Sequence, residues 1–374
     1  MTPPRPLPFV DLAAKFAPFR DSFHQDLDRV LLSGSYVLGR EGRQLEDEVA
    51  AFTGAAHAVS VANGTDALVL SLKALGVGPG DEVITTPMSY LATTSSIALC
   101  GATAVFVDVD DSLNLDPTRI EAAITARTKA ISVVHLSGLA ARIDRIVEIA
   151  ERYGLPIIED CAQAFGAVYQ GQDVGSFGRF AAISFHPLKN LGTLGDGGMI
   201  LARDAADAAW LRQARNHGHR SREECDFWSV NSRLDELHAA FLRTQLRAYP
   251  AELERRRSLA ATYRERLAGV VEFPKIHDGS LPSYNWVMML APRRQELIDA
   301  LAAHGIETKI HYPMLIPSLT AAGSLCRMDQ PCPNAVLRVD EILSLPSAEH
   351  VTLSDIEEVC RQIRRFYGAD NGAD

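Results

Sequence analysis

Three things that the sequence lacks narrow the classes of protein it can encode. No two of the six cysteines form a C-x-x-C pair, which disfavours a zinc site, and their scatter fits reduced thiols better than a disulfide framework. Basic residues are in deficit, with 37 Lys and Arg against 47 Asp and Glu, so the net charge of −10 disfavours a nucleic-acid partner. No apolar run is long enough to span a membrane, and Met1 to Pro8 carries no signal-peptide core. We therefore expect a cytoplasmic protein without a bound metal.

What the chain does contain is enough apolar sequence for a large core. Its 374 residues, 47% of them hydrophobic, suggest one large domain and a smaller one. Short apolar runs alternate with helical patterns between residues 57 and 202, which predicts a mostly parallel, seven-stranded sheet covered by helices. After residue 270 the pattern changes to that of a small α+β unit. We place the large domain at 1–246 and the second, which opens with a long connecting helix, at 247–374.

The elements behind this division follow from apolar periodicity. Strands of the large sheet are expected at 57–61, 82–86, 104–107, 130–136, 156–158, 180–185 and 199–202. Two strands of the smaller domain are expected at 287–290 and 307–311. Helices are expected at 11–32, 44–52, 67–75, 91–99, 143–153, 231–267 (interrupted at Pro250), 294–303 and 353–366.

Lys189 stands on a short connection between two predicted core strands, 180–185 and 199–202. Burying an ammonium group is costly, and the same burial lowers the pKa of a lysine and makes it an amine nucleophile. The alternative is that Lys189 lies on a surface turn with its charge in water. The residues upstream of it favour the first interpretation.

Asp160 ends the apolar strand that precedes this connection, directly after Glu159. In an open parallel sheet the ligand crevice lies at the carboxyl ends of the strands, so Asp160 is expected to face a cofactor. Capping of a helix N-terminus is the alternative role. A lysine that forms a Schiff base and a carboxylate that holds a pyridinium nitrogen are the two groups that pyridoxal phosphate needs, and Lys189 and Asp160 supply both.

Two further features suit such a cofactor. Asn63-Gly64-Thr65-Asp66 is a turn of small residues that leads into a helix, and its backbone N–H groups with the helix dipole could cradle a phosphate at Gly64 and Thr65. An ordinary N-cap explains the same residues. Tyr90 follows the strand at 82–86, where a flat ring could stack on a pyridine, although plain core packing explains it equally.

At this point the chain resembles a known family, the pyridoxal-phosphate-dependent sugar aminotransferases of the DegT/DnrJ/StrS group, which have the aspartate aminotransferase fold (fold type I). The resemblance extends from Asp11 to about Leu345. Six motifs carry it in the family's order: Ser33 to Gly39, Asn63 to Leu68, Gly78 to Val83, Glu159 to Ala164, Ser184 to Asn190 and Asn231 to Glu236.

The resemblance implies a role for each candidate residue. Lys189 forms the Schiff base and moves the proton, and Asp160 keeps the pyridine nitrogen protonated. The phosphate is held by Gly64, Thr65, Ser184 and Asn231; Tyr90 stacks on the ring, and Gln163 packs against it or bonds its 3-hydroxyl. His186 either bonds near the cofactor or fixes the loop. Asn231 and the segment Ser33 to Gly39 imply a homodimer with composite sites, because in the family the asparagine reaches the partner's cofactor phosphate and the segment borders the partner's site.

The implied reaction moves an amino group, usually from L-glutamate, to a keto-sugar that is most often nucleotide-linked. Departures from the family pattern lie toward the substrate side, at Ser137, at Arg142-Ile143 and at Leu315-Ile316-Pro317. They leave open a second acceptor class, a ketocyclitol or another non-nucleotide carbonyl. A sugar dehydratase is disfavoured, because that branch replaces the lysine with histidine. A cofactor-binding regulator without turnover is the remaining alternative.

Overall fold

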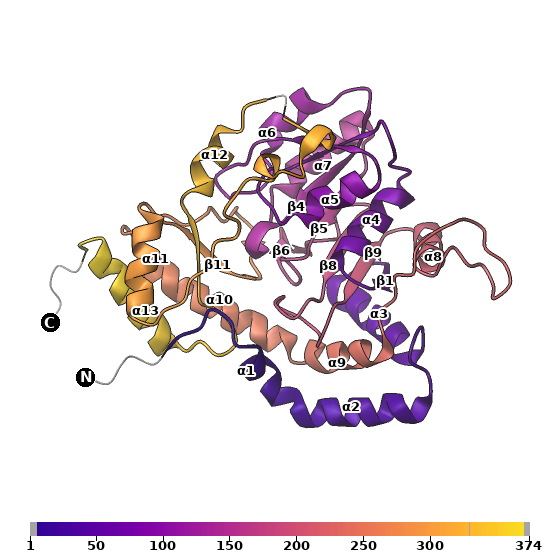
Figure 1. The fold of residues 1–374 in the computed structure, drawn as a ribbon, viewed down its shortest axis with the longest axis horizontal. Helices are drawn as coiled ribbons and strands as arrows, with labels where there is room; N and C mark the ends of the chain where they lie inside the picture. Colours follow the sequence, from indigo (N-terminus) through magenta and orange to yellow (C-terminus); the bar gives the residue numbers. More distant parts are fainter. Residues whose placement is uncertain (1–5, 329, 370–374) are drawn as a thin grey trace.

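A central sheet of eight strands organises the protein. The computed structural model describes residues 6–328 and 330–369. The strand order is β1-β9-β8-β5-β4-β2-β3-β12, and β9 is antiparallel to both of its neighbours while the other adjacent pairs are parallel (Figure 1). The strands are β1 (His57–Val61), β2 (Glu82–Thr85), β3 (Thr103–Phe106), β4 (Thr128–Val134), β5 (Ile157–Asp160), β8 (Phe180–Ser184), β9 (Gly198–Ala202) and β12 (Cys326–Arg327).

The seven strands predicted for the large sheet are therefore present, and the mostly parallel α/β architecture is confirmed. The eighth strand, β12, was not predicted. It contributes only two residues from the C-terminal part of the chain, which is too short for a periodic pattern, and it pairs with the edge strand β3.

Helices cover both faces of this sheet because its strands are apolar on both sides. Along β8, Phe180 and Ala182 belong to one apolar cluster, while Ala181 and Ile183 belong to another on the opposite face. The helices of this part are α3 (Arg40–Thr53), α4 (Gly64–Ala74), α5 (Ala92–Leu99), α6 (Pro117–Ile120), α7 (Ile143–Tyr153), α8 (Ala205–Ala214) and α9 (Glu236–Leu246).

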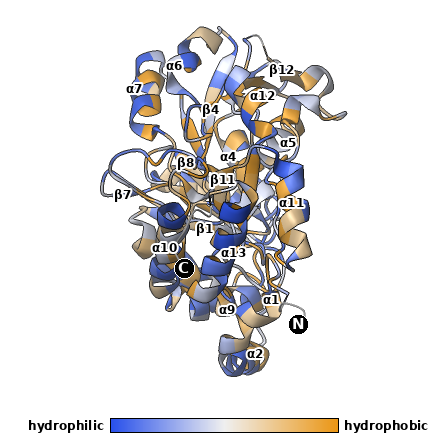
Figure 2. Ribbon diagram, turned by 90° about the vertical axis from the view of Figure 1, so that its left-hand side faces the viewer, coloured by the Kyte–Doolittle hydropathy of each residue, from blue (hydrophilic) through white to orange (hydrophobic). Residues whose placement is uncertain are grey.

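The C-terminal part has its own apolar cluster around a two-stranded sheet of β11 and β13. Figure 2 shows hydrophilic residues on α13, which has a hydrophobic side turned toward this cluster. Its elements are α10 (Tyr249–Arg266), β11 (Val287–Leu290), α11 (Arg294–Ala303), α12 (Pro333–Val339), β13 (Ile342–Leu345) and α13 (Leu353–Phe366). The division after residue 246 stays a prediction.

A third, small sheet joins the two parts of the chain. It consists of β6 (Val168–Tyr169), β7 (Gln172–Asp173) and β10 (Ser280–Leu281). Within residues 6–328 and 330–369, none of the helices combines the length and the apolar character that a membrane span requires.

Three predicted elements need correction. The helix expected at 11–32 is broken into α1 (Leu12–Phe16), a 3₁₀ turn (Ala17–Phe19) and α2 (Arg20–Ser33), because Pro18 cannot donate an intrahelical hydrogen bond. The helix expected from residue 231 begins only at α9. The strand expected at 307–311 is wrong: Lys309 makes a single isolated bridge to Ser344 of β13, and its neighbours extend no ladder.

The approach of β5 and β8 leaves room only for a hydrogen at Gly178. A Cβ there would lie 2.8 Å from the Ile157 carbonyl oxygen and 3.0 Å from that of Phe180. We expect Gly178→Ala to lower the free energy of unfolding by about 1–3 kcal/mol through overpacking. Gly78, where a Cβ meets nothing within 4 Å, is the matched control, and Gly78→Ala should stay within about 0.5 kcal/mol of wild type. Denaturant unfolding curves measure both, and equal stabilities would contradict the prediction.

Candidate active site

A cavity of about 560 Å³ opens at the carboxyl ends of the parallel strands. Its lining includes seven of the eight residues predicted for the site: Gly64, Thr65, Tyr90, Asp160, Gln163, Ser184 and Lys189. The tertiary structure thus collects side chains from the start of α4, the end of β5 and the loop after β8. Trp286, His311 and Tyr312 from the C-terminal part complete one wall.

Lys189 lies on the loop that joins β8 to β9, with its side chain toward this cavity. Desolvation lowers the pKa of Lys189 to about 8, although the nearby negative charge of Asp160 acts to raise it. A lysine with that pKa has a far larger neutral, nucleophilic fraction near neutral pH than an exposed one. The surface-turn alternative therefore does not describe Lys189, since its side chain is partly buried and lines the cavity.

Asp160 is only 5% exposed and is held by two hydrogen bonds. The Thr93 hydroxyl donates to its Oδ2 over 2.7 Å, and the Ala162 N–H donates to its Oδ1 over 3.2 Å. Thr93, in the first turn of α5, is in turn bonded to Ser89 over 2.9 Å. Thr93 was not predicted from the sequence as a site residue. The feature that could have indicated it is the small, polar first turn of this helix.

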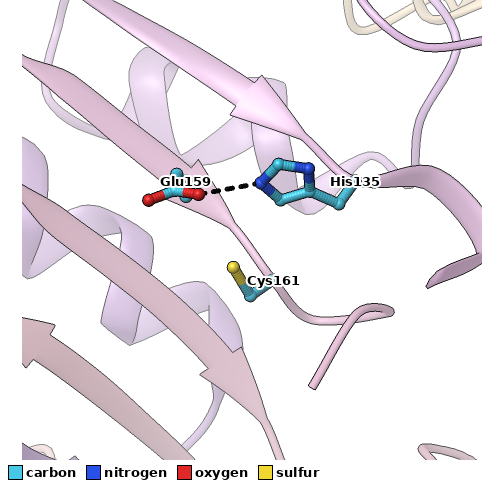
Figure 3. Close-up of side chains that lie close together, drawn as sticks. All are labelled: His135, Glu159 and Cys161. Carbon is cyan, nitrogen blue, oxygen red and sulfur yellow. Dashed lines mark hydrogen bonds and ion pairs between the residues drawn. The ribbon is translucent and has the colours of Figure 1, made fainter. Parts of the chain in front are cut away.

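The neighbouring acid, Glu159, faces the opposite side of the sheet and has a different task. Its side chain is fully buried and accepts hydrogen bonds from the backbone N–H groups of Gly175, Phe177 and Gly178. His135 Nε2 lies 3.0 Å from Glu159 Oε2, and Figure 3 marks this interaction with a dashed line. Glu159 therefore anchors the loop between β7 and β8 to the sheet and leaves Asp160 as the carboxylate of the cavity.

His135, Glu159 and Cys161 lie close enough together to suggest metal ligands (Figure 3). The hydrogen bonds argue for a structural cluster. His135 Nδ1 accepts from the Ala141 N–H over 3.1 Å, so Nε2 carries the proton and donates to Glu159. A metal ion would have to displace these bonds, and burial also raises the pKa of the Cys161 thiol, which opposes the thiolate form.

The turn before α4 has the geometry of an anion cradle. Asn63 is the N-cap and accepts from the Asp66 N–H over 2.8 Å. A Cβ on Gly64 would lie 2.8 Å from Cβ of Ser184, so only glycine lets the backbone come this close to β8. The Asn63 N-cap considered from sequence is thus present, and Thr65 and Ser184 line the same cavity.

Gln163 is fixed by residues from both parts of the chain. Its Oε1 accepts from the Ser137 N–H over 2.8 Å, and its Nε2 lies 3.3 Å from the Tyr312 hydroxyl. Tyr90 is half-exposed, with its ring centroid 5.6 Å from that of Tyr312, so the core-packing alternative does not describe it.

Two histidines near the cavity differ in their surroundings. His186 is exposed, and its Nδ1 accepts from the Leu188 N–H over 3.2 Å, which braces the lysine loop. Desolvation lowers the pKa of His311 to about 4, so its ring is neutral at physiological pH, and it stacks on Trp286 with ring centroids 4.4 Å apart. Neither His311 nor Tyr312 was among the residues predicted for the site, although both line the cavity.

Asn231 is the one predicted site residue that this chain does not bring to its own cavity. It is exposed and forms an isolated bridge with Asn216, in a segment that projects from the sheet beyond α8 (Figure 1). Trp228 in the same segment is 95% exposed.

A desolvated lysine, a buried carboxylate and an anion cradle, all at the carboxyl ends of a mostly parallel sheet, fit pyridoxal phosphate. Fold and site together define an aminotransferase of the pyridoxal-phosphate fold. More narrowly, the chain belongs to the DegT/DnrJ/EryC1/StrS aminotransferase family, whose model matches residues 19–364.

Individual relatives span almost the whole chain. A UDP-N-acetyl-3-dehydro-alpha-D-glucosamine 3-aminotransferase of Acidithiobacillus ferrooxidans is 42% identical, covering 98% of this chain and 99% of its own. A UDP-2-acetamido-2-deoxy-3-oxo-D-glucuronate aminotransferase of Pseudomonas aeruginosa is 40% identical, covering 94% and 98%. The crystal structure of S. venezuelae DesV in complex with a ketimine intermediate is 39% identical, covers 100% of both chains and superposes with a TM-score of 0.94.

The hydrogen bond from Thr93 to Asp160 should matter to the reaction. Thr93→Val removes a donor to a charged group, which contributes about 1.5 kcal/mol or more, so we expect amino transfer to slow about tenfold or more. The adjacent Thr94 is the matched control, because its hydroxyl is buried and has no hydrogen-bond partner among the described residues. Thr94→Val should keep the wild-type rate. Stopped-flow spectra with L-glutamate measure both variants, and equal rates would exclude a role for the Thr93 hydroxyl.

Proposed function

We propose that the protein transfers the amino group of L-glutamate to the keto carbon of a nucleotide-linked sugar, using pyridoxal phosphate held in the cavity described above. The observation that carries the proposal is the desolvated Lys189 amine beside the buried Asp160 carboxylate. When bound, the cofactor supplies an aldehyde that condenses with amines and a pyridinium ring that accepts electrons.

Different residues of the chain would then have different roles. Lys189 would hold the cofactor through its amine, and the same amine, when free, would move a proton. Asp160 would hold the proton at the ring nitrogen, and Thr93 would orient that carboxylate. The hydroxyls of Thr65 and Ser184 and the backbone at Gly64 would hold the phosphate, where the dipole of α4 favours negative charge.

The remaining contacts would set the ring in place. Tyr90 has an exposed face in the cavity and would stack on the ring, and Gln163, already fixed by Ser137 and Tyr312, would pack against it or bond its 3-hydroxyl. His186 would brace the loop through its bond with the Leu188 N–H, rather than act on the substrate.

Two relatives support a particular class of acceptor. Two enzymes that are about equally similar to this chain over almost their whole length are named for UDP-linked sugars with a keto group at C3. We therefore propose a nucleotide-linked 3-keto-hexose for this protein. No observation on the cavity favours a ketocyclitol, and the filled lysine and carboxylate positions argue against a regulator without turnover.

We further propose a homodimer with composite sites. Among the described residues that line the cavity, Lys189 is the only Lys or Arg. The same lining contains three carboxylates, those of Asp66, Asp160 and Asp196. Phosphate groups and L-glutamate are anionic, so one chain alone supplies too little positive charge. The projecting segment that holds Asn231 also carries Arg222, while its Arg220 is paired with Glu224 and Asp226, and a two-fold partner would bring this segment to the cavity.

The function is tested with purified protein, pyridoxal phosphate, L-glutamate and UDP-N-acetyl-3-dehydro-glucosamine. We expect mass spectrometry to show the 3-amino sugar, and borohydride reduction to fix the cofactor on Lys189 in peptide maps. Attachment of pyridoxal phosphate to the apoprotein should accelerate as the pH rises through about 8, and not near 10.5. The neutral amine is the reacting form, and desolvation lowers the pKa of Lys189 to about 8.

Lys189→Ala should lose both the adduct and the product, whereas Lys73→Ala, an exposed lysine at the end of α4, should keep them. An adduct on another lysine would contradict the assignment of Lys189 as the attachment site. A normal adduct with no amination of any nucleotide-linked keto-sugar would contradict only the proposed acceptor.

Mixing two inactive variants tests the composite site. Lys189→Ala and Asn231→Ala homodimers should each be impaired, because each lacks one part of every site. In a mixed dimer one site holds both defects and the other holds neither, so activity should partly recover after subunit exchange. Light scattering and isotope-labelled mass spectrometry verify the exchange. A fully active monomer, or no recovery after proven exchange, would rule out shared sites.

A further inference from the structure

Lys15 is a buried lysine outside the cavity. It contacts the main chain of the loop that carries Lys189. It lies on α1, its side chain is 6% exposed, and its Nζ donates to the Lys189 carbonyl oxygen over 2.5 Å and to that of Pro187 over 3.1 Å. An ammonium group in such a place is stable only if its charge and all its N–H groups find partners.

The third partner is Glu349, from the segment between β13 and α13, whose Oε1 lies 3.6 Å from Lys15 Nζ. Burial acts to raise the pKa of Glu349, but Arg256 and Lys15 outweigh it and lower this pKa to about 2, so the carboxylate stays charged. Arg256 of α10 is itself buried and bonds Glu349 over 2.7 Å and Glu252 over 2.8 Å. Lys15 thus donates hydrogen bonds to two carbonyls, and its charge is balanced by the Glu349 carboxylate in an ion pair.

The two carbonyls belong to the turn that presents the reactive lysine. Within that turn, the Lys189 N–H donates to the His186 carbonyl over 2.8 Å, and Asn190 Nδ2 donates to the Ser283 carbonyl over 2.9 Å. These bonds fix the turn on either side of Lys189 Cα. The bond from Lys15 fixes the carbonyl of Lys189 itself, and so sets the rotation of the peptide from which the side chain leaves.

We propose that Lys15 is a positioning residue for Lys189: it holds the main chain at residues 187–189 so that the Lys189 amine is directed into the cavity. The inference rests on the proposed function of Lys189. Lys15 touches neither substrate nor cofactor, and its effect passes through the backbone. Because Glu349 and Arg256 come from the C-terminal part, the same contact couples the packing of that part to the reactive loop.

The experiment compares Lys15→Met, which fills the space without donors, with Lys15→Gln, which is shorter and keeps one neutral donor. For Lys15→Met we expect kcat to fall about tenfold or more, with KM for L-glutamate within about twofold of wild type. Peptides covering residues 185–193 should exchange amide hydrogens faster in the apoprotein, and covalent attachment of pyridoxal phosphate should slow. Lys15→Gln should show smaller changes in kcat, in amide exchange and in the rate of cofactor attachment. Lys73→Met is the control that should match wild type.

A purely structural role predicts a different pattern, in which the melting temperature falls and the folded fraction keeps its kcat and its exchange at residues 185–193. That pattern, or wild-type kcat in Lys15→Met, overturns the inference. If Lys15→Met does not fold, wild-type kcat in Lys15→Gln overturns it instead. A wild-type protein that forms no adduct at Lys189 defeats the proposed function, whereas a normal wild type with an unaffected Lys15→Met defeats only the role of Lys15.

Discussion

The partial desolvation of one lysine amine, beside a buried carboxylate, is the constraint on which the rest of this structure depends. Desolvation lowers the pKa of Lys189, and Asp160 opposes it without cancelling it. The cavity must therefore keep water from the amine while leaving the face toward a ligand open. The sheet does this by ending β5 and β8 at the same edge, so that both groups meet where the strands stop.

The pleat of β5 separates two acids that are adjacent in sequence. Glu159 and Asp160 point to opposite faces of the sheet. The Glu159 carboxylate is therefore hydrogen-bonded by three backbone N–H groups and His135, while the Asp160 carboxylate faces the cavity. A shift of one residue in the pairing of β5 with its neighbours would exchange the two. The close contact at Gly178 and the hydrogen bonds from the loop between β7 and β8 to Glu159 both act against such a shift.

The supports of the site come from distant parts of the chain. Thr93 of α5 holds Asp160, Ser137 holds Gln163, and Lys15 of α1 holds the backbone of Lys189. Each lies far in sequence from the group it holds. Such supports give a site its precision, because a reacting group displaced by about 1 Å loses much of its rate.

The sequence by itself determined seven of the eight strands of the large sheet, most of the helices beside them, the lysine on its connection and the acid at a strand end, because apolar periodicity and tight turns are local properties. Helices at 143–153, 294–303 and 353–366 were predicted with the bounds that they have. Only the tertiary structure decided which polar residues are buried and what they meet. Lys15 and Glu349 look like ordinary surface charges in their segments, and the strand expected at 307–311 failed because one bridge to Ser344 does not make a ladder. Burial and hydrogen-bond partners depend on segments hundreds of residues apart, which no local pattern records.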